Sequence, residues 1–185
     1  MQTDRDTDKA TATATATATA GATPSRRVVT GIAVVQLLSI AVWAGGLLAL
    51  GAIVAPIVFR VVPAPTSADA MTLVFRRFDV VAIVCAAVAL VAEAAFAKRG
   101  GKVTRSDLAR GLSLVAASGL AIAIGAWLSP GIADLHRAGA IRGIGESGLA
   151  LERLHHFAEA FAKTEILLLG AVFVLGVAKA SRSPH

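Results

Sequence analysis

The sequence predicts an all-α integral membrane protein, a four-helix bundle whose long helices extend beyond the bilayer. Residues 28–59 form a run of 32 positions without Asp, Glu, Lys, Arg or His. About 20 apolar residues suffice to cross a hydrocarbon core of about 30 Å. Over the chain, 56% of residues are hydrophobic and 16% are charged, which is unlike a soluble domain. Three further apolar runs bring the predicted spans to four, at about 30–58, 78–97, 110–133 and 160–179.

The chain divides into a helical membrane domain and two tails. Residues 1–24 contain a Thr-Ala repeat from Thr11 to Ala20, and we expect them to be disordered because little of this segment can be buried. The alternative, a twin-arginine export signal at residues 25–27, conflicts with an apolar run far longer than a signal sequence requires. The membrane domain is predicted to cover residues 25–180, and residues 181–185 form a second tail.

The first two helices are separated by a proline-rich break. Residues 63–65 read Pro-Ala-Pro and end the first helix. Ser67 is predicted to cap the second helix, with Asp69 in its first turn. This helix is expected to run to about Lys98, well beyond its apolar part.

The third and fourth helices carry boundaries of their own. Thr104 and Asp107 have the spacing of a capping box, and residues 129–131 (Ser-Pro-Gly) are expected to kink or end the third helix. The fourth span has only 13 uncharged residues, but an amphipathic stretch precedes it. We therefore predict one long helix over about 147–179.

Basic residues flank the apolar runs and indicate the orientation. Outside the tail at 1–24, nine Lys or Arg residues lie on the side of the termini and seven on the other, with a dense cluster at 98–110. The positive-inside rule then predicts cytoplasmic N- and C-termini, in a bacterial inner membrane. The net charge of +6 indicates contact with anionic lipid headgroups rather than with nucleic acid.

Small residues recur at four-residue spacing in two spans. Such faces allow close approach of helices, either within one bundle or in a homo-oligomer. The two sets are Ala41, Gly45 and Ala49 in the first span and Ala117, Ala121 and Gly125 in the third.

The fourth helix carries the densest set of potential metal ligands. Glu152, His155, His156 and Glu159 lie within eight residues. Two His and a carboxylate could bind copper or zinc, with Asp134 or His136 completing the site. The alternatives are a solvated helix face with i,i+4 pairs, Glu152 with His156 and Glu159 with Lys163, and a proton or substrate relay.

Two glutamates stand in or beside apolar spans. An ionisable group within a span is costly and indicates a functional role. Glu93 and Glu165 are therefore candidates for lining a polar path between the helices. For Glu93 the structural alternative is an ion pair with Arg110, or a position at the membrane interface.

Several motifs suggest a family. Residues 43–46 (WAGG), 54–59 (VAPIVF) and 75–79 (FRRFD), together with Leu154-His155, resemble the transmembrane protein 205-like domain family, also called domain of unknown function 4149. The resemblance covers about residues 29–177. It implies a four-helix membrane protein without an agreed biochemical activity. Trp43, Gly45, Gly46 and Pro56 are its candidate packing motif.

The first span is also similar to copper-resistance D proteins and to haem-carrying membrane oxidases. Those haem proteins place a histidine about two turns before the tryptophan, where this chain has Gln36. An amide side chain is not an ordinary axial haem ligand.

Three classes of function follow. The first is non-enzymatic transport or homeostasis of a small solute or metal ion, which requires the polar groups to converge inside the bundle. The second is a membrane scaffold, whose charges would point outward. The third is a haem- or metal-dependent oxidoreductase. The sequence shows no phosphate loop or nucleophile elbow, so we expect no enzyme and no cofactor, apart from the copper or zinc considered above.

Overall fold

The computed structural model describes residues 26–98 and 103–182, and within these ranges every regular element is a helix. The helices in chain order are α2 (Arg26–Ala49), the π-helical segment η1 (Leu50–Val54), α3 (Ala55–Val61), α4 (Thr66–Ala97), α5 (Arg105–Ala123), the π-helical segment η2 (Ile124–Leu128), α6 (Ser129–Arg137) and α7 (Gly145–Arg182). The predicted tail at 1–24 lies outside the described residues, as do 183–185 of the C-terminal tail.

The described ranges contain four helices long and apolar enough to cross a membrane, which confirms the predicted fold class. They are Arg27–Val61, Thr66–Ala97, Arg105–Arg137 and Gly145–Lys179. Residues 26–32 form the first two turns of α2, and the packing described below concerns the compact unit that begins at Ala33.

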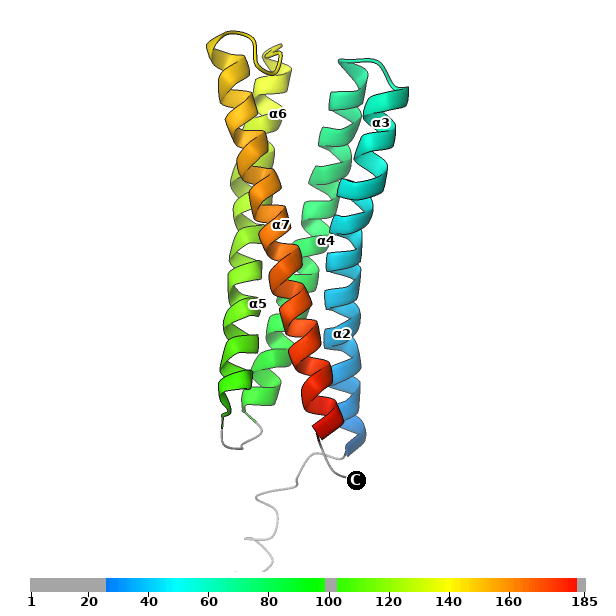
Figure 1. Cartoon of the computed structure of the whole chain (residues 1–185), viewed down its shortest axis with the longest axis vertical. Helices are drawn as coiled ribbons and strands as arrows, with labels where there is room; N and C mark the ends of the chain where they lie inside the picture. Colours follow the sequence, from blue (N-terminus) through cyan, green and yellow to red (C-terminus); the bar gives the residue numbers. More distant parts are fainter. Residues whose placement is uncertain (1–25, 99–102, 183–185) are drawn as a thin grey trace, which may run out of the picture. The chain divides into compact units, whose positions relative to one another are not determined.

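Successive long helices of this unit run in opposite directions (Figure 1). Helix α5 packs against α4 and α7, α6 packs against the same two helices, and α3 packs against α4. Short connections favour this arrangement because they place consecutive helices side by side. Polar side chains on the inner faces can therefore reach neighbouring helices.

The capping box at the start of α5 is confirmed. The Asp107 N–H donates to Thr104 Oγ1 at 3.2 Å, and the Thr104 N–H donates to Asp107 Oδ2 at 3.2 Å. The long fourth helix is also confirmed, as α7. The predicted Ser67 cap is wrong. Pro65 already has near-helical dihedral angles, so the helix begins at Thr66 and Ser67 lies buried in the first turn.

Both mid-span prolines follow a π-helical segment. Pro56 follows η1 and Pro130 follows η2, and the residue before each proline donates to the carbonyl five residues back. A proline in an α-helix clashes with the carbonyl four residues back, and the wider turn relieves that clash. The helix consequently continues past Pro130 to Arg137 instead of ending there.

The core is apolar and built largely from small residues. Trp43, Leu114 and Leu169 are fully buried at its centre, among alanines of α4 and α5. The small residues of α5 pack here, whereas those of α2, Ala41, Gly45 and Ala49, are exposed. The outside of the bundle is rich in large apolar side chains, including Trp127 at 80% exposure. An apolar exterior of this kind suits contact with lipid.

The four residues of the candidate packing motif occupy different environments. Trp43 is buried, and Gly46 lies against the Phe78 ring, where an added Cβ would come within 2.2 Å of a ring carbon. Gly45 has open space at the corresponding position, and Pro56 is exposed. Two of the four residues therefore pack inside the bundle.

Candidate functional site

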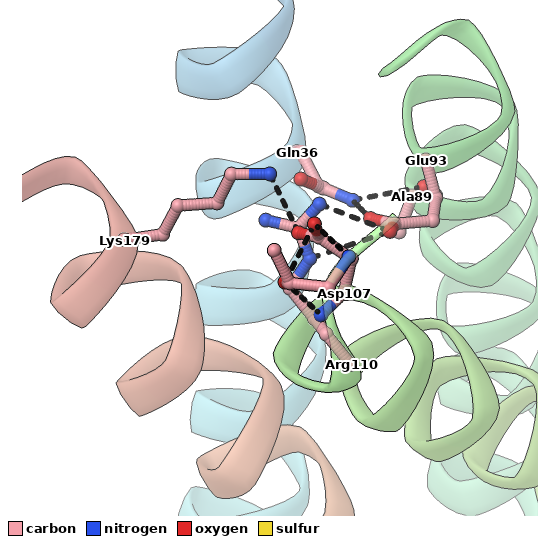
Figure 2. Close-up of polar contacts among 7 residues, drawn as sticks. Gln36, Ala89, Glu93, Asp107, Arg110 and Lys179 are labelled. Carbon is pink, nitrogen blue, oxygen red and sulfur yellow. Dashed lines mark hydrogen bonds and ion pairs between the residues drawn. The ribbon is translucent and has the colours of Figure 1, made fainter. Parts of the chain in front are cut away.

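Glu93 lies at one end of the bundle with both carboxylate oxygens paired (Figure 2). Arg110 of α5 donates to Glu93 Oε1 from Nη2 at 2.9 Å and from Nε at 3.3 Å. Gln36 of α2 donates to Glu93 Oε2 at 2.8 Å and to the Ala89 carbonyl at 3.3 Å. The side chains of Arg110 and Glu93 are only 10% and 17% exposed. The predicted alternative for Glu93, an ion pair with Arg110, is confirmed.

A second ion pair extends this cluster to the fourth span. Lys179 of α7 donates to Asp107 Oδ1 at 2.5 Å, one turn before Arg110 on α5. The Arg110 guanidinium also lies 5.8 Å from the centre of the Phe96 ring, within the range of a cation–π contact. We call the set Gln36, Glu93, Asp107, Arg110 and Lys179 the ion-pair layer. All four spans contribute to it.

Glu165 lies deeper in the bundle and is almost completely buried, at 1% exposure. Trp43 of α2 donates its indole N–H to Glu165 Oε2 at 3.1 Å. Oε1 is also buried, and no described side chain or backbone group makes a hydrogen bond to it. Unpaired buried polar atoms are rare in native proteins and call for an explanation.

A second carboxylate lies near Glu165. Asp79 of α4 is within electrostatic range of it, and Ser129 of α6 donates its hydroxyl to Asp79 Oδ2 at 2.6 Å. Gly125 allows Asp79 of α4 to lie close to η2, since a Cβ added at Gly125 would stand 3.2 Å from the Asp79 Cβ. Around Glu165 the bundle interior thus holds two carboxyl groups, each with one neutral hydrogen-bond donor.

The His155 region lies near the opposite end of α7 from the ion-pair layer. The His155 and His136 rings meet edge to face, with centroids 5.9 Å apart. The His155 side chain is half-buried, whereas His156 is exposed. Glu152 lies 3.9 Å from the His156 ring nitrogen and 3.8 Å from Arg142.

The predicted i,i+4 pairs of the solvated helix face are both present. Besides Glu152 with His156, Lys163 donates to Glu159 at 2.7 Å, and both of these side chains are exposed. Within residues 26–98 and 103–182, no three His, Cys, Asp or Glu side chains are grouped to hold a metal ion. The copper or zinc site stays a prediction without a ligand set among these residues.

Sequence reasoning found Glu93, Glu165 and Arg110 but did not assign roles to Gln36, Asp79 or Ser129. The sequence marks Gln36 only as the residue that stands where the haem proteins have a histidine. It is nevertheless a long polar side chain inside an uncharged run, and such groups tend to bond across helices. Asp79 ends the 75–79 motif at the start of an apolar span, a position that alone could have marked it.

A family model described as a domain of unknown function, DUF4149, matches residues 38–140. The chain belongs to this family. The DUF4149 match includes Trp43, Asp79, Glu93, Arg110 and Ser129, whereas Gln36 and all of α7 lie outside it. No curated protein and no solved structure matches the chain. These comparisons give no support to the resemblance to copper-resistance D proteins.

Proposed function

We propose that this membrane protein transports a small solute or ion through the polar interior of its helical bundle, without catalysing a reaction. The observation that carries the proposal is the burial of Glu165 and its unpaired Oε1. Glu93 supports it, because its carboxylate also points between the helices. A scaffold would hold these charges on its outer faces.

Energetics favour a functional role over a packing role for Glu165. An isolated buried carboxylate costs several kcal/mol or more, and helices in a membrane pack well without one. A leucine of similar size at position 165 would serve the core better. The ion-pair layer is different, since its charges neutralise one another and hold the four spans together.

The polar groups follow one another along the bundle. Trp43 stands seven residues beyond Gln36 on α2, or about 10 Å at 1.5 Å per residue. Asp79 lies 14 residues from Glu93 on α4, or about 21 Å. Glu165 interacts with both Trp43 and Asp79 and therefore links these two levels. We propose this series as the transport path, with the ion-pair layer at the cytoplasmic end in a bacterial inner membrane.

Flux measurements in proteoliposomes test the proposal. Purified protein is reconstituted, and entry of protons, Cu²⁺ or Zn²⁺ is followed with a trapped fluorescent indicator for each ion. We expect flux of at least one of these ions above that of empty liposomes, reduced at least about tenfold, or 1.4 kcal/mol, by Glu165→Gln.

The matched control is Glu159→Gln, six residues away on the same helix and exposed. This control should transport like the wild type. The proposal fails if no ion enters faster than into empty liposomes, or if Glu165→Gln transports as well as Glu159→Gln.

A further inference from the structure

Among the described residues, no cation forms an ion pair with Glu165. From α2 it meets the neutral Trp43 indole, and from α4 the charged group in range is Asp79, a like charge. Asp79 itself interacts with Arg76 and bonds to Ser129 of α6. The described surroundings of Glu165 thus provide one hydrogen bond and no positive partner.

A metal ion is a poor occupant of this position. Mg²⁺ and Ca²⁺ require six or more oxygen ligands, and zinc sites usually have at least three protein ligands. The indole of Trp43 is a donor only and cannot ligate. One oxygen of Asp79 is already bonded to Ser129. A proton, in contrast, needs only the one free oxygen that Glu165 offers.

We propose that Glu165 binds and releases a single proton at Oε1, and that the proton is the ion moved or coupled by the transport activity. This inference deepens the proposed function and rests on it. The proton is taken from a hydronium ion or water on one side and returned to water on the other, so that one O–H bond forms as another breaks. Trp43 holds Oε2 throughout and leaves Oε1 free for the exchange.

Labelling with dicyclohexylcarbodiimide tests the proton site directly. The O–H of a neutral carboxylic acid adds across one C=N bond of this apolar reagent, and the adduct rearranges to a stable N-acylurea without loss of any group. Peptide mass spectrometry on the full chain in detergent should find the adduct on Glu165. Labelling should fall at least about tenfold between about pH 6 and about pH 9, as expected when a buried acid loses its proton.

Glu93 is the internal control because its carboxylate is paired with Arg110, and it should stay unmodified. A second measurement does not depend on whether the reagent can reach Glu165. The infrared difference spectrum between acidic and alkaline samples should show the carbonyl stretch of a neutral carboxylic acid, and Glu165→Gln should remove it. Absence of both the adduct and this band would overturn the inference.

The results separate the inference from the proposed function. A labelled Glu165 in a protein that moves no ion would leave the proton site standing and reject transport. Flux of Cu²⁺ or Zn²⁺ with no titration at Glu165 would keep transport and reject the proton.

Discussion

Breaking the Glu93–Arg110 pair should destabilise the bundle far more than breaking an exposed pair of similar geometry. Arg110 Nη2 lies 2.9 Å from Glu93 Oε1, and both side chains are mostly buried. Removing one partner of a buried pair leaves an uncompensated charge and costs about 3–5 kcal/mol. We expect Glu93→Gln or Arg110→Gln alone to lower the free energy of unfolding by about this amount, and the double variant to lower it by less than the sum.

The coupling energy can be placed on a scale. Two unit charges about 4 Å apart attract by about 4 kcal/mol at an effective dielectric constant of 20. The remaining exposure of both side chains reduces this value, so we expect a coupling of about 2–4 kcal/mol. The Glu159–Lys163 pair is the matched control at 2.7 Å, but its side chains are 58% and 71% exposed. Pairs of that kind couple by about 0.3–0.5 kcal/mol.

The assay is unfolding in mixed micelles with increasing dodecyl sulfate, followed by far-ultraviolet circular dichroism. Both double-mutant cycles are measured under the same conditions, so detergent effects cancel. The reasoning would be refuted by equal coupling energies for the two pairs, or by single variants at Glu93 and Arg110 that unfold like the wild type.

Two further predictions concern local packing. Gly46→Ala should lower the stability by about 1–3 kcal/mol because its Cβ would strike the Phe78 ring, whereas Gly45→Ala should be neutral or stabilising; the same micelle unfolding assay compares them, and equal effects would contradict the packing described. Thr104→Ala should lower the stability by about 1 kcal/mol because it removes the cap of α5. The measurement is hydrogen exchange of the Asp107 amide, which should become faster, and unchanged exchange would count against the capping box.

The spans and their boundaries could be predicted because each depends on local sequence. A hydrocarbon layer sets the length of an apolar helix, and a capping box needs only residues three apart. The Glu93–Arg110 pair could also be predicted from the sequence, since a short connector joins α4 to α5 and brings their adjoining ends together. These features require no knowledge of how the helices are rotated.

The contacts of Glu165 depend on that rotation and could not be derived. Trp43 and Glu165 are 122 positions apart, and their bond exists only because α2 and α7 turn particular faces inward. The same limit applies to the two adjacent glycines, which differ only in which of them meets Phe78. The polarity of Gln36 and Asp79 indicated buried bonding, but not with which partner.

The two π-helical segments have a mechanical consequence. Leu50 stands 14 residues beyond Gln36 on the first span, and Ile124 stands 14 residues beyond Arg110 on the third. Gln36 and Arg110 bond to the same carboxylate, so both segments begin about 21 Å from that level. The second and fourth spans are continuous α-helices. The protein thus combines two continuous helices with two helices that contain a π-helical segment, and both segments lie at the same level. Bending at these segments would tilt one end of the bundle, while the end that holds the ion-pair layer keeps its shape.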